Sequence, residues 1–222
     1  MSILFVLLMF LLIMTISSFR RQQPQPTPAV FAADAPRAPR MQREYGFEIP
    51  QGYCFHPGHT WALKEAPETA RVGLDSFATR MFGKIDRVEV IGLNRWVRQG
   101  QKLLTIHSNG RAVDLMSPVE GVVTALNQDV AHDPSLVARD PFQQGWVAMV
   151  KAPDLALNQN NLVQAGMVAP WLQNSVTRLN GMLNQASPAL AQDGGLPLDG
   201  VLDRVSADVR ENLVREFFLC GC

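Results

Sequence analysis

The stretch SPVEGVVTALNQDVAHDPSLVARDPFQQGW, residues 117–146, constrains the fold more than any other part of the sequence. It contains GVVTALN (121–127), a strand-length run rich in β-branched residues that follows a glycine. Asp133-Pro134 and Asp140-Pro141 are turn formers, because proline keeps the preceding residue out of the helical region. A second apolar run, GWVAMVKAP (145–153), begins where the stretch ends. The pattern predicts short strands joined by turns.

The same pattern continues toward the N-terminus. Four further strand-length apolar runs are TARVGLDSF (69–77), GKIDRVEVIG (83–92), KLLTIHS (102–108) and AVDLMSP (112–118). Short strands at this spacing predict an all-β sandwich or barrel. We predict one helix among them, SFATRMFG (76–83), because its apolar residues have helical spacing and Gly83 is placed to cap it. Four large aromatic residues are predicted for the core: Trp61, Phe77, Phe142 and Trp146.

These motifs resemble the lipoyl-carrying H protein of the glycine cleavage system over about 100 residues. HTW (59–61) resembles the family's His-Glu-Trp, and VGLDSFATRMFGKI (72–85) resembles its Val-Gly-Ile-Thr-Asp-Tyr-Ala…Leu-Gly-Asp-Ile. The stretch 117–146 is similar to its Ser-Pro-Val-x-Gly-x-Val…Asn-Pro-x-Leu-(Val/Ile)-Asn-x-x-Pro-Tyr-x-x-Gly-Trp. The resemblance implies a lipoyl/biotinyl-type flattened β-barrel, a barrel-sandwich hybrid of two small sheets, whose hairpin presents a modified lysine.

The lysine that the resemblance implies is missing. The spacing between Gly100 and Pro118 equals that of the family, so the alignment needs no gap and the lysine column falls on Gly110. Lipoylation forms an amide with an ε-amine, and the adjacent Arg111 keeps its proton and is a poor acyl acceptor. The other lysines of the domain, Lys64, Lys84, Lys102 and Lys151, lie outside the tip in the sequence. We therefore expect no lipoylation and no cofactor.

The sequence at this tip, Ser108-Asn109-Gly110-Arg111, predicts a closed turn. Asn-Gly between strands is the strongest two-residue hairpin signal, because a type I′ turn needs positive φ at both central positions. His107 and Arg111 beside the turn are either a small cationic recognition point or two solvated side chains.

No catalytic set emerges: we find no nucleophile–base–acid arrangement, phosphate-binding loop or paired carboxylates, and expect a protein that is not an enzyme. Cys54, His56 and His59 have a spacing that a metal could use, but Pro57 makes the stretch a turn and His59 falls on the family's structural histidine. Cys220 and Cys222 end the chain, and we interpret them as two exposed thiols.

The N-terminus predicts a membrane anchor. Residues 2–19 carry no charge and are just long enough to span a bilayer, which gives a transmembrane anchor at 1–21. Arg20-Arg21 follow the apolar run, which favours a cytoplasmic body; the alternative is export, with VFA before Ala33 as a cleavage site. Residues 22–44, rich in Pro, Gln and Ala, are predicted to be an extended linker.

The β domain is expected to cover 45–153, and a helical extension 154–222. Residues 167–186 and 206–219 have apolar stripes at helical period, with Pro170 in a first turn, Ser206 as N-cap and Glu211–Arg215 as an i,i+4 pair. Two short helices are not stable alone, so they must pack on the barrel, on each other or on a partner.

Lys+Arg and Asp+Glu are both 20, so no overall charge points to nucleic acid. We expect a membrane-tethered, non-catalytic, H-protein-like scaffold or accessory subunit, whose partner proteins bind the C-terminal helices or the hairpin tip. Two alternatives stay open: a lipoate-dependent carrier modified at another lysine, and a metal or redox module that uses Cys54, His56 and His59.

Overall fold

The computed structural model describes residues 41–44, 46–186 and 199–219. The predicted transmembrane segment at 2–19, most of the predicted linker, and Cys220 and Cys222 lie outside these ranges. Across the described ranges, no helix is long and apolar enough to cross a membrane. Strand β1 (Met41–Glu44) pairs with β2 (Phe47–Pro50), so paired structure begins within the range that we assigned to the linker.

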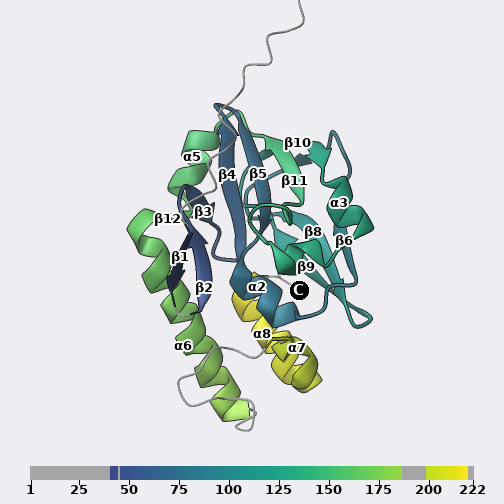
Figure 1. Ribbon diagram of the computed structural model, residues 1–222, viewed down its shortest axis with the longest axis vertical. Helices are drawn as coiled ribbons and strands as arrows, with labels where there is room; N and C mark the ends of the chain where they lie inside the picture. Colours follow the sequence, from purple (N-terminus) through teal and green to yellow (C-terminus); the bar gives the residue numbers. More distant parts are fainter. Residues whose placement is uncertain (1–40, 45, 187–198, 220–222) are drawn as a thin grey trace, which may run out of the picture. The chain divides into compact units, whose positions relative to one another are not determined.

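Two antiparallel sheets form the body of the domain (Figure 1). The larger sheet has the order β12 (Val163–Gln164), β3 (Tyr53–Phe55), β4 (Thr60–Ala66), β5 (Thr69–Leu74), β11 (Ala148–Lys151), β10 (Gly121–Leu126) and β7 (Trp96–Val97). The smaller sheet has the order β6 (Arg87–Val90), β8 (Lys102–Ser108) and β9 (Arg111–Met116). Each of the six apolar runs quoted above overlaps one of these strands, as predicted.

Helix α2 (Ser76–Phe82) confirms the predicted helix. The side chain of Asp75 accepts a hydrogen bond from the backbone N–H of Ala78 at 2.8 Å, which caps the first turn. Gly83 ends the helix with a φ of 67°.

The prediction that 76–83 is the central domain's one helix was wrong. Helices α3 (Gln128–His132) and α4 (Leu136–Arg139) form inside 117–146. The two Asp-Pro pairs end these helices, because Asp133 and Asp140, each followed by proline, leave the helical conformation. Proline thus marks helix ends here, where we had expected only turns between strands.

The C-terminal part is mainly helical, as expected, but it also supplies strand β12, which pairs with β3. Its elements are α5 (Leu155–Asn160), the 3-10 turn η1 (Ala165–Met167), α6 (Val168–Ala186), α7 (Val201–Arg204) and α8 (Ala207–Phe218). Arg215 pairs with Glu211 at 3.0 Å, as predicted. Ser206 occupies the N-cap position, but its side chain makes no capping hydrogen bond.

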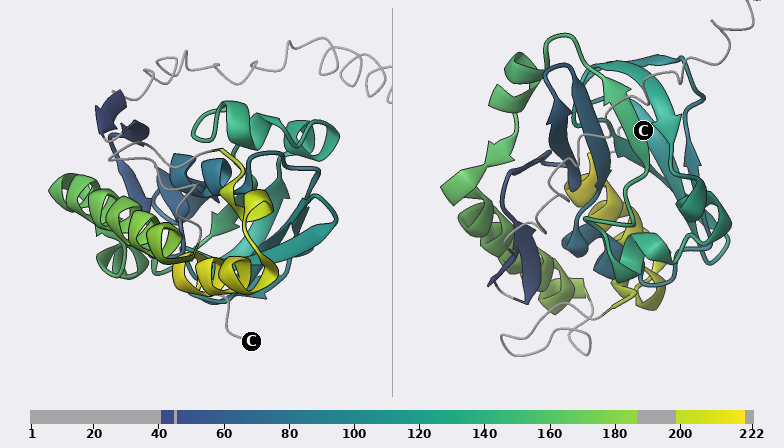
Figure 2. Two further views of the ribbon diagram at one scale, coloured as in Figure 1. Left: turned by 90° about the horizontal axis from the view of Figure 1, so that it is seen from below. Right: turned by 45° about the horizontal axis from the view of Figure 1, so that its top comes forward.

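The helices pack on the barrel and on each other, with α8 contacting both α6 and β9 (Figure 2). Phe217 and Phe218 of α8 are fully buried, and the Phe218 ring stacks on Phe82 of α2 at 5.0 Å between centroids. The extension therefore supplies part of the hydrophobic core.

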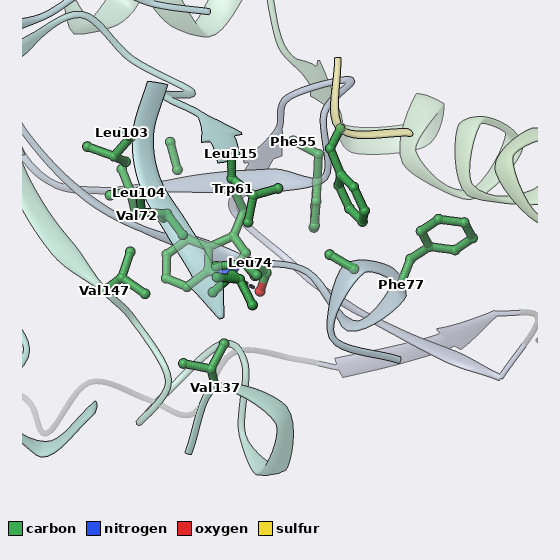
Figure 3. Close-up of a cluster of buried hydrophobic side chains, with 14 of the residues drawn as sticks. Phe55, Trp61, Val72, Leu74, Phe77, Leu103, Leu104, Leu115, Val137 and Val147 are labelled. Carbon is green, nitrogen blue, oxygen red and sulfur yellow. Dashed lines mark hydrogen bonds between the residues drawn. The ribbon is translucent and has the colours of Figure 1, made fainter. Parts of the chain in front are cut away.

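Trp61 lies within the core between the sheets (Figure 3). Its indole N–H donates to the carbonyl oxygen of Leu74 at 2.7 Å, which satisfies its one polar atom. Tyr53 packs edge-on against Trp61, with ring centroids 5.0 Å apart. Of the four predicted core aromatics, Trp61, Phe77 and Phe142 are buried and Trp146 is partly buried against them.

Candidate functional site

The hairpin between β8 and β9 is closed by a two-residue turn, as predicted. Ser108 and Arg111 face each other in the register, and Asn109 and Gly110 between them have φ angles of 49° and 74°. Positive φ at both central positions is the conformation that a type I′ turn needs. Both residues are exposed, and a Cβ added at Gly110 would meet no atom within 4 Å.

The turn does not stand alone, however, because two carboxylates hold Asn109. Its backbone N–H donates to Oδ2 of Asp86 at 2.7 Å. Its side-chain amide donates to Asp203 of α7, whose other oxygen accepts from Arg111 at 3.2 Å. Asp203 of the C-terminal extension thus contacts the residues on both sides of Gly110, Asn109 and Arg111. The closed turn that the sequence predicts is therefore also bound to the rest of the fold.

A lysine lies close to this turn, although the sequence placed it elsewhere. The ammonium of Lys84 is 2.8 Å from Oδ1 of Asp86, the same carboxylate that holds Asn109. The Lys84 side chain is 74% exposed. The hydrogen bond with Asp86 raises the pKa of Lys84, and that bond together with the Asn109 N–H lowers the pKa of Asp86. Lys84 is therefore a charged, accessible neighbour of the tip.

The two residues considered as a cationic recognition point, His107 and Arg111, both contact local partners, and Nε2 of His107 also lies 2.9 Å from the guanidinium of Arg87. Arg111 pairs with Asp203, and Nε2 of His107 lies 3.1 Å from the carboxylate of Glu89. Farther down the hairpin, Asp114 accepts hydrogen bonds from Thr105 and Lys102. Its partial burial raises the pKa of Asp114, but these two bonds outweigh that effect and leave the pKa below its usual value.

Two glycines let α7 approach the hairpin. The backbone N–H of Gly200 donates to the carbonyl oxygen of Arg80 at 2.7 Å. A Cβ on Gly83 would lie 2.6 Å from the Cα of Gly200, closer than side-chain atoms tolerate. Because only glycine fits at position 83, the end of α2 and the start of α7 touch through their backbones, and Asp203 comes within reach of the turn.

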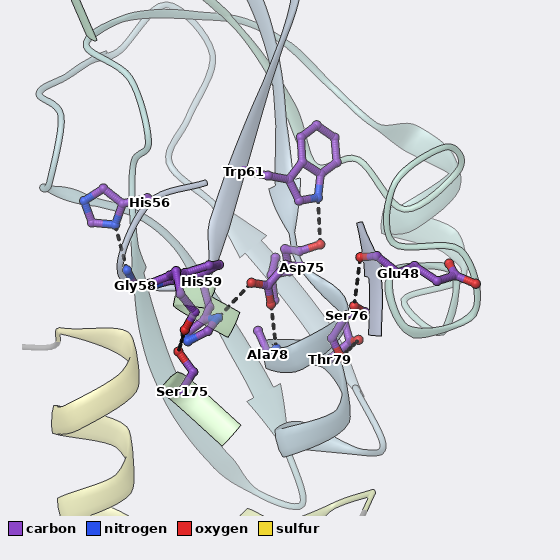
Figure 4. A network of polar contacts seen from close by, with 12 residues as sticks. Glu48, His56, Gly58, His59, Trp61, Asp75, Ser76, Ala78, Thr79 and Ser175 are labelled. Carbon is purple, nitrogen blue, oxygen red and sulfur yellow. Dashed lines mark hydrogen bonds and ion pairs between the residues drawn. The ribbon is translucent and has the colours of Figure 1, made fainter. Parts of the chain in front are cut away.

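Immediately before β4, His59 forms a buried pair with Asp75 (Figure 4). Nδ1 of His59 donates to Oδ2 of Asp75 at 2.7 Å, and the His59 ring is only 1% exposed. The ring is stacked between Phe77 at 4.2 Å and Trp171 of α6 at 4.7 Å. Because Asp75 also caps α2, this pair joins the strand, the helix and the extension.

The three metal candidates have separate partners. Nδ1 of His56 accepts from the N–H of Gly58 at 3.0 Å, and Cys54 Sγ lies 3.5 Å from Gln159 and 3.6 Å from Gln164. Burial, with a smaller effect of His59, lowers the pKa of His56 to about 4, and burial raises the pKa of Cys54. Among the described residues, no three His, Cys, Asp or Glu side chains gather where they could hold a metal ion.

Sequence reasoning missed Lys84, Asp86 and Asp203 as parts of this site. Asp86 and Lys84 precede β6, and only the pairing of β6 with β8 brings them to the hairpin end. Asp203 is separated from Asn109 by most of the C-terminal half of the chain. The one local signal was Lys84 itself, which stands where the resemblance shows an aspartate.

Comparison with known proteins agrees with this architecture. The family model described as glycine cleavage H-protein matches residues 53–175. A glycine cleavage system H protein from Magnetococcus marinus is 33% identical over 125 residues, which cover 56% of this chain and 88% of that protein. One from Legionella pneumophila (strain Corby) is 36% identical over 97 residues, covering 44% and 77% of the two chains.

A crystal structure of a glycine cleavage system H protein from Mycobacterium marinum also matches. It is 26% identical, aligns over 47% of this chain and 86% of its own, and gives a TM-score of 0.44. The matches in sequence are long enough to settle the family. The chain belongs to the glycine cleavage H-protein family.

Proposed function

We propose that this chain is a membrane-anchored, non-lipoylated H-protein-like scaffold or accessory subunit with no catalytic activity of its own. The observation that carries the proposal is the tip of the hairpin. Gly110 stands in the lysine column of the family, in a closed turn that Asp86 and Asp203 hold from both sides. A lipoyl group needs an ε-amine for its amide bond, so it does not fit at position 110.

The C-terminal helices are the better candidate for a partner-binding surface, because α7 already occupies the hairpin tip. Beside the start of α6 lies a hollow of about 660 Å³ with a mainly apolar lining. Its rim includes Met167, which is 66% exposed, and Arg178. An exposed methionine next to an apolar hollow is typical of adaptable protein-binding surfaces.

Purification of the tagged full chain from its native membranes tests the scaffold role. We expect defined protein subunits to co-purify with the wild type and to be lost with Met167→Glu. Asn184→Glu is the matched control, because Asn184 is exposed near the other end of α6. A wild-type preparation that reproducibly retains no other subunit would contradict the proposal.

Membrane attachment through 2–19 and a cytoplasmic body are further parts of the proposal. The uncharged run and the following Arg20-Arg21 support them. Protease treatment of inside-out and right-side-out vesicles measures the orientation. Digestion of the body only from the cytoplasmic side is expected, and digestion only from the opposite side would favour the exported alternative.

A lipoyl carrier modified at another lysine is the second candidate, and the position of Lys84 favours it. Lys84 is exposed and reaches the carboxylate that holds Asn109. Peptide mass mapping of the native protein and of Lys84→Arg separates the two candidates. An acyl group on the wild-type Lys84 peptide that is absent from the variant would establish the carrier and reject the scaffold proposal in its non-lipoylated form.

A further inference from the structure

The turn between β6 and β7 exposes two large apolar side chains. Leu93 is 50% exposed and Trp96 is 52% exposed. The N–H of Arg95 donates to the carbonyl oxygen of Gly92 at 3.3 Å, which closes the turn with Leu93 at its tip. Val97, which follows Trp96 in β7, is only 2% exposed. The core thus accepts the side chain of Val97, while that of Trp96 faces solvent.

The sheet register gives this tryptophan cationic neighbours. Trp96 pairs with Val122 of β10, and Val122 pairs with Lys151 of β11, so the three side chains share the outer face of the larger sheet. Strands β10 and β11 lie next to each other in Figure 1. Arg95 and Arg98 lie immediately before and after β7, and both are exposed. We call Leu93, Arg95, Trp96, Arg98 and Lys151 the Trp96 patch.

The basic residues of the patch differ from those on the smaller sheet. Arg87 and Lys102 there form ion pairs with Glu89 and Asp114. Among the described residues, by contrast, no carboxylate pairs with Arg95, Arg98 or Lys151 within 4.0 Å. Glu120, the acidic residue next to Gly121 on β10, forms no ion pair with them either. Three cations without an ion pair among the described residues thus lie near an exposed indole, two in the sequence and one in the sheet register.

This combination suits the surface of an anionic membrane. Indole rings prefer the boundary between headgroups and acyl chains, and basic side chains gain from anionic headgroups, each by roughly fivefold in affinity. We propose that the Trp96 patch rests on the anionic headgroups of the membrane that holds the chain. This inference builds on the proposed anchor at 2–19, which keeps the domain close to the bilayer.

The length of the linker permits the contact. Residues 22–40 lie between the predicted anchor and β1, and a proline-rich chain extends by about 3 Å per residue. The linker predicted from this composition is long enough for the domain to reach the bilayer surface. A tether of this kind raises the effective concentration of the second site to the order of millimolar, so a weak patch is sufficient.

The test uses the full chain reconstituted in vesicles of phosphatidylcholine and phosphatidylglycerol that carry bromine on their acyl chains. Bromine quenches tryptophan fluorescence only at close range, and flotation of the same sample reports the anchor. We expect a quenched component in the wild type that disappears in Trp96→Phe. In Arg95→Gln/Arg98→Gln, the equilibrium constant for docking of the patch on the vesicle should fall by roughly 25-fold. The quenching should also weaken in 1 M salt. Arg139→Gln/Arg215→Gln is the control, because both arginines are exposed outside the patch.

The outcomes separate the patch from the anchor. A chain that floats with the vesicles but shows no quenching dependent on Trp96 overturns the patch and keeps the anchor. Equal quenching in pure phosphatidylcholine vesicles overturns the role of the cations. A chain that does not float with any vesicle rejects the anchor and the patch together. Loss of a co-purifying subunit in Trp96→Phe, with unchanged quenching, assigns the surface to a protein instead.

Discussion

His59 and Asn109 both depend on the C-terminal extension, but in different ways. His59 is buried, donates to Asp75 at 2.7 Å and has Trp171 of α6 stacked on its ring. Asn109 is exposed, and its side-chain amide donates a hydrogen bond to the carboxylate of Asp203 on α7 of the extension. Burial makes the first contact a matter of folding stability, whereas solvent screens the second. The extension is therefore part of the hydrophobic core beside His59, whereas at the hairpin it contributes an exposed polar contact.

Removal of an aromatic ring from the extension should have the largest effect. Phe217→Ala leaves a cavity beside Phe77, whose ring centroid is 5.2 Å away, and should lower the free energy of unfolding by about 3–5 kcal/mol. Asn212→Ala, on the exposed face of α8, should change it by less than about 0.5 kcal/mol. Urea unfolding of both variants measures the difference. Equal effects would mean that the extension is not part of the core.

Loss of the carboxylate at position 75 should follow. Asp75→Ala removes the cap of α2 and leaves Nδ1 of His59 buried without a partner, which together should cost about 2–4 kcal/mol. Asp75→Asn keeps an oxygen for the cap, so we expect it to be clearly less damaging. Thermal unfolding monitored by calorimetry compares the two, and identical losses would show that the cap of α2 contributes nothing measurable.

The stability of the fold should also depend on pH through His56. Burial lowers the pKa of His56 to about 4, so the unfolded chain takes up this proton first as the pH falls below about 6.5. Stability should therefore decrease by roughly 2–3 kcal/mol between pH 6.5 and pH 4. His56→Gln should flatten this dependence, while His132→Gln, on the exposed face of α3, should leave it unchanged. If the steep decrease in stability persists in His56→Gln, it arises from other titratable groups.

The smallest effect is expected at the hairpin tip. Asp203→Ala removes an exposed ion pair and should cost less than about 1 kcal/mol of global stability. Amide hydrogen exchange at Asn109 and Arg111 should nevertheless become faster, because the turn loses its hold on α7. Glu211→Ala breaks the exposed pair with Arg215 and should leave exchange at the tip unaffected. Unchanged exchange in Asp203→Ala would show that the turn needs no support from the extension.

Local patterns predicted those features that depend on neighbours in the sequence. The six strand runs, helix α2 with its Gly83 cap, the Glu211–Arg215 pair and the turn at Asn109-Gly110 all formed where their residues indicated. The short helices α3 and α4 were missed, because their Asp-Pro ends carry the same residues as turns between strands.

The features that were missed depend on distant parts of the chain. Lys84 was placed outside the tip because sequence distance does not show that β6 pairs with β8. The approach of Asp203 requires two backbones to touch at Gly83 and Gly200, and no period or motif reports such a contact. The membrane anchor at 2–19 and the terminal thiols lie outside the described residues and remain predictions.

We propose that this H-protein family member carries no acyl group on the lysines of its β domain. The most direct measurement is the intact mass of the protein isolated from its own cells, followed by peptide mapping across Lys84 and the tip. We predict unmodified side chains at every lysine of the β domain. A lipoyl adduct on any of them, and on Lys84 above all, would contradict it.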